Sequence, residues 1–256
     1  MRERGKYSLT LYKEKFKRFF IIILLAALYT ASGLAIEIFF IIKKSQQYLL
    51  EFSLADSYIL LGNPFILAFA VALPYFVVLC FLLFHDFTPQ YLLKNGKRQT
   101  LWFRQSSLIF LTSLLWTFLT GIIIFCLSRP FITYWINWTD MGSFFYYKMG
   151  QTADFSFFYV VFLSLVDTWF ILLLLGVMFL FVYWCADSLT VCFLIFFLIL
   201  GALQIQPFFF PFVSYTTIIS WKTLVFSTLS CFVLWITATY GAAKLKTIDR
   251  KEFYGK

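Results

Sequence analysis

The sequence predicts an all-α membrane protein with six transmembrane helices and with both its N-terminus and its C-terminus in the cytoplasm. Three observations support this fold class. Of the 256 residues, 62% are hydrophobic and only 13% are charged, whereas a soluble domain is about one quarter charged. The apolar residues fall into long runs of the length that a bilayer requires. The basic residues gather in the segments between alternate runs.

Each predicted span is a run of about 20 mainly apolar residues, the number that crosses a bilayer as a helix. The second span begins at Asn63 and Pro64, and proline is tolerated there because the first helical N–H has no partner in any case. The segments between the spans are too short to fold separately, so we expect one domain over residues 1–256. The predicted spans are residues 19–42, 62–84, 106–127, 155–184, 189–206 and 223–243.

The distribution of Lys and Arg predicts the orientation. Sixteen of the 21 basic side chains lie in the N-terminal tail, in the segment 85–105 or in the C-terminal tail. Basic residues gather on the cytoplasmic side of membrane proteins, so these three segments are expected in the cytoplasm. The net charge of +9 is therefore explained by topology, and it does not indicate a nucleic-acid partner.

Two cytoplasmic segments have the pattern of short helices. Residues 1–18 place apolar side chains three and four residues apart, which is typical of an amphipathic helix at the membrane surface. Within residues 87–99, Thr88 can cap a helix, Pro89 suits its first turn, and Gly96 can end it. A helix this short is not stable alone in water, so we expect it to dock on the membrane or on a partner.

The predicted docking surface of the 87–99 helix combines apolar and basic side chains. The apolar residues are Tyr91, Leu92 and Leu93, and the basic residues are Lys94, Lys97 and Arg98. A phosphate-binding loop would need the spacing Gly-x-x-x-x-Gly-Lys-[Ser/Thr], and "NGKRQT" has only one glycine. The segment is therefore interpreted as a docking element rather than a nucleotide site.

Ionisable residues inside apolar spans are costly and are candidates for function. Asp167 lies deepest, near the middle of the fourth span, and Arg129 at the outer end of the third span is the nearest basic residue by depth. Glu37 lies toward the outer end of the first span. Each of these side chains either forms a structural pair or belongs to a path for a substrate or a proton, and the sequence leaves both open.

No catalytic or metal-binding pattern is found. The chain has one histidine, His85, and its five cysteines include no Cys-x-x-Cys pair, so a zinc site of the usual kind is not expected. His-Glu-x-x-His and Gly-x-Ser-x-Gly are also missing from the sequence. We therefore predict no catalytic residue, no metal ligand and no enzymatic activity in this chain.

Two further features concern packing. Ala27, Ala31 and Ala35 repeat every four residues in the first span, and such small-residue stripes allow helices to approach closely, within the chain or between subunits. Residues 204–222 are too apolar for an ordinary loop and contain Pro207 and Pro211, which interrupt a helix. This segment is expected to re-enter the outer leaflet, where protein must cover its irregular backbone.

The combination of these features resembles the type-2 ABC exporter permeases. It consists of six spans with both termini inside, the amphipathic 1–18 helix, the segment 204–222, and a basic loop between spans two and three that contains "LLKNGKRQTLWF". The closest similarity is to Gram-positive permeases that export antimicrobial peptides or confer immunity to them. The resemblance covers nearly the whole chain.

The resemblance implies a function that the residues alone do not predict. It implies that the 87–99 helix couples to a separate cytosolic ATP-binding subunit, which would hold ATP and magnesium, so that this chain needs no cofactor. It also implies a second permease, identical or homologous, with the first span at the seam. The expected activity is export of a hydrophobic or amphipathic substrate, a peptide or an antibiotic, across the bacterial plasma membrane.

Two other classes remain open. One is the substrate-binding membrane component of an energy-coupling-factor importer, which also has six spans with both ends inside and packs on small-residue stripes such as the one in the first span. The other is a membrane accessory or sensor protein that transports nothing. An ATPase that binds the 87–99 helix directly favours the permease, and an ATPase that is held only through a second membrane protein favours the importer.

Overall fold

The computed structural model describes residues 2–84, 98–186, 189–205 and 214–219, together with Val233 and Thr237. These residues form helices joined by turns and short loops. No strand occurs within these ranges, and the only β-type contact found there is an isolated parallel bridge between Glu51 and Ser143. The predicted all-α class is confirmed for this part of the chain.

Four helical segments are long enough and apolar enough to cross a membrane. They lie close to the predicted spans 19–42, 62–84, 106–127 and 155–184, because the apolar runs that define a span also define the helix. The protein is therefore membrane-embedded in character. The four segments are Phe19–Gln47, Pro64–Leu83, Leu101–Ser128 and Phe157–Trp184.

The first helix, α1, runs without interruption over Arg2–Gln47. The sequence suggested a separate amphipathic helix over residues 1–18, and the structure joins this segment to the first span. The physical reason is that residues 6–32 contain neither glycine nor proline, so no residue there ends the helix. Of the most apolar stretch of this span only 17% is buried inside the protein, compared with 67% for Pro64–Leu83.

The second span begins as the sequence predicted. The side-chain oxygen of Asn63 accepts a hydrogen bond of 3.0 Å from the backbone N–H of Phe65, and Pro64 occupies the first turn. The segment before this cap contains two short helices. The elements of this region are α2 (Leu54–Ile59), η1 (Leu60–Gly62), α3 (Pro64–Ile66), η2 (Leu67–Ala72) and α4 (Leu73–Phe84).

Within the second span, η2 is a π-helical turn, and Pro74 explains it. Proline has no N–H, so the α-helical hydrogen bond to the carbonyl of Ala70 cannot form, and the backbone widens just before it. The carbonyl of Val71 in this turn accepts a hydrogen bond of 3.1 Å from Trp116 Nε1. The turn also packs tightly on α1, where a Cβ added to Gly33 would lie 2.9 Å from Ala70 Cβ.

The remaining described helices are α6 (Arg98–Ser128), α7 (Phe144–Met149), α8 (Phe157–Ala186), α9 (Leu189–Ile205) and α10 (Tyr215–Ile219). The helix α9 has 17 residues and corresponds to the predicted fifth span over residues 189–206. The predicted sixth span over residues 223–243 lies outside the described residues except for Val233 and Thr237. Six spans in total therefore remain a prediction.

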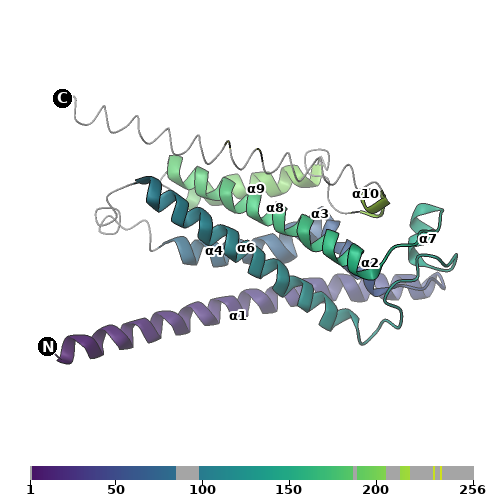
Figure 1. Cartoon of the computed structure of the whole chain (residues 1–256), viewed down its shortest axis with the longest axis horizontal. Coiled ribbons are helices and arrows are strands. Elements are labelled where there is room, and N and C mark those ends of the chain that lie inside the picture. The colour runs from purple at the N-terminus through teal and green to yellow at the C-terminus, as the bar shows by residue number, and fades with distance from the viewer. Residues whose placement is uncertain are drawn as a thin grey trace.

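The bundle has two different ends (Figure 1). The start of α1, the end of α4 and the start of α6 lie toward one end, which we call the tail end. The short helices α2, α7 and α10 lie at the opposite end. We call the structure at that end the cap, and define it as α2, the segment 129–156 that contains α7, and α10.

Three spans meet at Gly176 of α8. A Cβ at this position would lie 2.6 Å from Ile109 Cγ2 of α6 and 2.8 Å from the hydroxyl of Tyr75 of α4. Real Cβ atoms do not approach other atoms this closely, so a side chain here forces Ile109, Tyr75 or the helices that carry them to shift. The helices α4, α6 and α8 therefore form a close-packed junction that depends on the missing side chain.

We predict that Gly176→Ala destabilises the protein by about 1–3 kcal/mol, because overpacking shifts side chains and backbone in a dense core. Thermal unfolding of the purified full chain in detergent measures this. The matched control is Gly201→Ala in α9, where an added Cβ meets no atom within 4 Å and alanine favours the helix. Equal melting temperatures for Gly176→Ala and wild type would contradict the junction.

Candidate functional site

The carboxyl group of Asp56 lies at the centre of the cap and is fully buried. Asp56 belongs to α2, which begins after Ser53. The backbone N–H and the hydroxyl of Ser53 both donate to Asp56 Oδ2, at 2.8 Å and 2.7 Å. A side chain in the first turn that reaches back to the residue before the helix is a common way to fix a helix start.

The second carboxyl oxygen of Asp56 is held by distant parts of the chain. Trp138 Nε1 and the hydroxyl of Tyr215 each donate a hydrogen bond of 2.9 Å to Oδ1. These partners are 82 and 159 residues away in sequence, on the segment 129–156 and on α10. Four donors from three chain segments therefore meet on one carboxyl group.

Backbone hydrogen bonds attach α2 to the same segment. The first N–H groups of a helix have no partner within the helix. In α2, the N–H of Leu54 donates to the carbonyl of Tyr134, and the N–H of Ala55 donates to the carbonyl of Trp135, both at 3.0 Å. The segment 129–156 thus satisfies the open end of α2 as well as its carboxyl group.

A compact aromatic cluster excludes water from this carboxyl group. Trp138 stacks on Phe145 of α7 with ring centroids 4.4 Å apart. Tyr215 meets the edges of both rings, at 5.7 Å from Trp138 and 5.4 Å from Phe145. The buried core of the cap consists of Ala55, Ile59, Trp138, Phe145, Val160 and Ile218.

Burial controls the protonation of this group. Loss of water raises the pKa of Asp56 above 3.8, although the four hydrogen bonds act in the opposite direction. Burial also raises the pKa of Tyr215, and the charge of Asp56 contributes to the same shift. The pair therefore holds its protons more tightly than the same groups do in water.

The cap is tied directly to the membrane-spanning bundle. The hydroxyl of Tyr58 in α2 donates a hydrogen bond of 3.0 Å to the carbonyl of Gly121 in α6. Burial raises the pKa of Tyr58 to about 12, so this donor keeps its proton at physiological pH. A displacement of the residues that are hydrogen-bonded to Asp56 can therefore be passed on to α6 through α2.

A second polar region lies inside the bundle, around Asp167 of α8, which is 5% exposed. The helices α6 and α8 run antiparallel (Figure 1), with Gly121 against Leu165 and Ser113 bonded to Trp169. This register puts Asp167 level with Thr117 of α6. The buried polar side chains on the two helices are Gln105, Ser106, Ser113, Thr117, Thr120, Ser128, Ser164, Asp167 and Thr168.

The structure separates the other two ionisable candidates from Asp167. The guanidinium of Arg129 donates to the carbonyl of Ile132 at 2.9 Å and lies 5.6 Å from the ring centre of Trp135. Arg129 is exposed at the cap end of α6, whereas Asp167 lies level with Thr117 in the middle of that helix. Glu37 is half-buried on α1. The three residues therefore do not form one site.

The alanine stripe borders the contact between α1 and the bundle. Ala27, Ala31 and Ala35 are each half-buried, and the fully buried stripe lies one residue away from each of them. Gly33, beside this stripe, packs tightly on η2, where an added Cβ would lie 2.9 Å from Ala70 Cβ. The buried stripe consists of Ala26, Thr30, Leu34, Ile38 and Ile42.

The predicted docking helix 87–99 falls mainly outside the described residues. The residues of its predicted docking surface that lie outside the described part are Tyr91, Leu92, Leu93, Lys94 and Lys97. Arg98 is described as the first residue of α6. The predicted segment 204–222 is likewise described only in part, at the end of α9 and over residues 214–219, where α10 packs in the cap.

Sequence reasoning missed Asp56, Trp138 and Tyr215. The search for ionisable groups was confined to the apolar spans, and Asp56 lies between them. A usable signal was present in "SLADSYILL", because Ser followed three residues later by an acidic residue before an apolar run is typical of a helix start. In the part of the chain that the structure describes, no group of three or more His, Cys, Asp or Glu could hold a metal ion.

The raised pKa of Asp56 predicts a pH dependence of stability. Between 3.8, the value in an unfolded chain, and the raised value, the folded state binds more protons than the unfolded state, so the free energy of unfolding falls as pH rises. Asp56→Asn removes this contribution. Melting temperatures of the full chain in detergent from about pH 4 to pH 8 should therefore fall more steeply for wild type than for Asp56→Asn.

The matched control for this measurement is Asp140→Asn, since Asp140 is exposed in the same cap. It should leave the wild-type slope unchanged. Parallel slopes for wild type and Asp56→Asn would show that Asp56 is already ionised throughout the range and would contradict a raised pKa.

Comparison with known proteins adds no relative to this picture. No family model, no curated protein and no solved structure matches the chain. The function proposed below therefore starts from the residues and contacts described above.

Proposed function

We propose that this chain is the permease subunit of an ABC exporter in the bacterial plasma membrane. It would move a hydrophobic or amphipathic substrate, a peptide or an antibiotic, out of the cell. The observation that carries the proposal is that the two ends of the bundle differ. The apolar helices have the basic start of α1, the end of α4 and the start of α6 at one end and a folded aromatic cap at the other.

The energy for transport would come from a partner. The sequence has no Gly-x-x-x-x-Gly-Lys-[Ser/Thr] loop for ATP, so a cytosolic subunit with ATP and magnesium is required. The segment 87–99 is the proposed contact, since it lies between α4 and α6 in the chain and offers Tyr91, Leu92 and Leu93. A second permease, identical or homologous, would pack on the sparsely buried helix α1 along Ala27 and Ala31.

The packing of the bundle suggests how motion would travel. The helices that flank the segment 87–99, α4 and α6, both contact α8 at Gly176 with no space for a side chain. Close-packed elements move together rather than deform. A displacement at the coupling segment would therefore carry α4, α6 and α8 as a unit, and the bond from Tyr58 to Gly121 would extend it to the cap.

The proposed substrate path runs beside Asp167. A buried carboxyl group inside the bundle, level with the hydroxyl of Thr117, gives an otherwise apolar interior a polar region. In membrane proteins such residues commonly mark paths for substrates, ions or protons. An amphipathic substrate could exchange its polar groups with this region while its apolar groups face the surrounding helices.

We predict that the double variant Leu92→Asp with Leu93→Asp abolishes binding of the ATPase while the chain still inserts into the membrane. Two buried charges at an apolar contact cost far more than the contact contributes. Co-purification of the tagged chain with its ATPase measures this. Leu49→Asp is the control, because Leu49 is 90% exposed at the cap end and should leave binding unchanged.

Full retention of the ATPase by the double variant would contradict the docking surface. An ATPase that is recovered only together with another membrane protein would instead support the importer class.

We predict that Asp167→Ala lowers transport at least about fivefold, in line with the effect of removing one important polar contact of about 1–3 kcal/mol. The readout is resistance of cells that produce the chain with its ATPase, tested with hydrophobic peptide antibiotics. Asp154→Ala is the control, since Asp154 is exposed before α8. Unchanged resistance for Asp167→Ala, with equal amounts of protein in the membrane, would exclude Asp167 from the path.

A further inference from the structure

The four donors around the Asp56 carboxyl group are of two kinds. The backbone N–H of Ser53 and Trp138 Nε1 can only donate a hydrogen bond, whereas the hydroxyl oxygens of Ser53 and Tyr215 can also accept one. A proton on the carboxyl group therefore has a hydroxyl oxygen within 2.7 Å on one side and 2.9 Å on the other. The site fits an ionised carboxylate with four donors, and it fits a neutral acid after one hydroxyl bond has reversed.

Tyr215 is the most accessible part of this site. Among the described residues that bond Asp56, Ser53 and Trp138 are 0% and 1% exposed, whereas Tyr215 is half-buried. Water therefore reaches the carboxyl group most directly when Tyr215 leaves its place.

The helix that carries Tyr215 is small. Tyr215 is the first of the five residues of α10, and a helix this short depends on its tertiary contacts. Ile218 holds α10 in the core of the cap, and the Tyr215 ring meets Trp138 and Phe145. Elements with few buried contacts are the first to open in a folded protein, so α10 is the part of the cap that can be displaced most easily.

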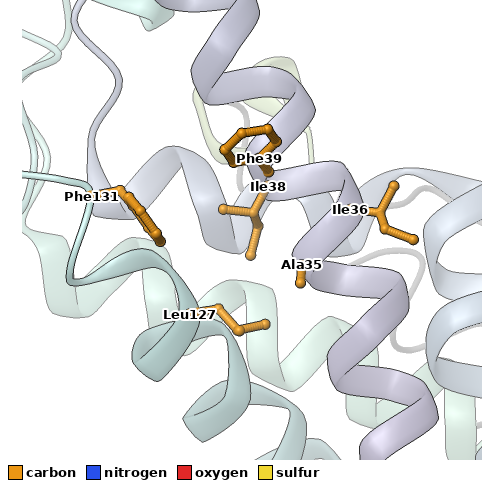
Figure 2. A pocket seen from close by; sticks show the side chains of 6 residues that line it. All are labelled: Ala35, Ile36, Ile38, Phe39, Leu127 and Phe131. Carbon is orange, nitrogen blue, oxygen red and sulfur yellow. The ribbon is translucent and has the colours of Figure 1, made fainter.

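The segment 129–156 is the fixed part of the cap. The N–H of Glu51 donates to the carbonyl of Gly142, and the N–H of Phe144 donates to the carbonyl of Glu51, both at 2.9 Å. The start of the segment lies beside α1, where Phe131 lines an apolar groove together with Ile38 and Phe39 (Figure 2). A change in distance between α10 and this segment therefore reports a movement of α10.

Docking of α10 is linked to protonation of Asp56. With α10 in place, burial raises the pKa of Asp56 above 3.8 in spite of the hydrogen bonds. With α10 displaced, water reaches the carboxyl group and its pKa moves back toward 3.8. The docked state therefore binds the proton more tightly. Its advantage is fully present below pH 3.8 and is lost as the pH rises through the raised pKa.

The neighbouring groups do not share this behaviour. Burial raises the pKa of Tyr58 to about 12 and also raises that of Tyr215, so both keep their protons near neutral pH. The titratable groups packed near the carboxyl group or its neighbours are Tyr58 of α2, Cys126 of α6, Tyr159 of α8 and Tyr215 of α10. The other charged side chains in and beside the cap are exposed, and they are Glu51, Arg129, Asp140, Lys148 and Asp154.

We propose that Asp56 and Tyr215 form a proton-controlled latch, in which a protonated Asp56 keeps α10 docked on the cap and ionisation of Asp56 releases it. Because α10 follows α9 in the chain, release separates this part of the chain from α2 and from the segment 129–156. The latch is a property of the cap and does not depend on the proposed transport function.

The test measures the distance between α10 and the fixed part of the cap at different pH. In a variant whose five native cysteines are replaced, Thr216 and Met141, both exposed, are changed to cysteine and spin-labelled. Double electron–electron resonance on the full chain in lipid nanodiscs gives the distribution of distances. From about pH 4 to pH 8, the wild-type latch should pass from one narrow distance to a mixture that includes a longer one.

Two variants in the same background separate the parts of the latch. Asp56→Asn removes the titratable group, so the docked fraction should no longer change with pH. Tyr215→Phe keeps the ring and should raise the ratio of undocked to docked α10 about fivefold, the factor that corresponds to about 1 kcal/mol for one hydrogen bond. The control is Tyr159→Phe, because Tyr159 is also half-buried but does not bond Asp56. It should leave the distribution unchanged.

Four results would overturn the proposal. They are a wild-type distribution that stays the same over the whole pH range, a longer distance that grows as the pH falls, an equal pH dependence for wild type and Asp56→Asn, and the same distribution for Tyr215→Phe and Tyr159→Phe. The wild-type and Tyr215→Phe measurements decide the proposal even when Asp56→Asn does not fold.

Discussion

The burial of the Asp56 carboxyl group is the constraint on which the cap depends. A carboxylate without water is unstable unless donors replace the lost solvation. Here the donors come from Ser53, from Trp138 in the connection between α6 and α8, and from Tyr215 beyond α9. Three connections that would otherwise be independent loops are therefore held in one folded structure.

The bundle below the cap is held unevenly. The helices α4, α6 and α8 close on Gly176, and the π-helical turn before Pro74 lets Trp116 bond a backbone carbonyl of the neighbouring span. By contrast, α1 packs tightly on η2 at Gly33 but leaves most of the apolar surface of its span outside the fold. That surface is exposed in the single chain, which is why the proposed contact with a second permease is placed on α1.

The sequence predicted the described spans well because hydrophobic length is a local property. Asn63 and Pro64 also marked a helix start correctly, since a cap acts through its own next residues. The continuity of α1 was missed because a change from amphipathic to fully apolar composition was taken as a boundary, although no residue ends the helix there. Pattern alone does not distinguish one helix from two in such a stretch.

The candidate site was predictable only in part. The burial of Asp167 followed from its place in an apolar run, but its neighbour Thr117 follows from the register of α6 and α8, which needs contacts far apart in sequence. The hydrogen bonds of Asp56 with Trp138 and Tyr215 could not be predicted either, because they join residues that are far apart in sequence. The burial of Trp138 and Phe145 in the core of the cap also does not follow from the aromatic composition of their segment.

The central claim is that the cap and the segment 87–99 lie on opposite sides of the membrane, with the cap outside. Site-directed labelling tests it most directly, in a variant whose five native cysteines are replaced. Met141, 75% exposed in the cap, and Lys94 are each changed to cysteine and treated with a maleimide that does not cross membranes. The account predicts labelling at position 141 in intact cells and at position 94 only after permeabilisation. Labelling of position 94 in intact cells would contradict it.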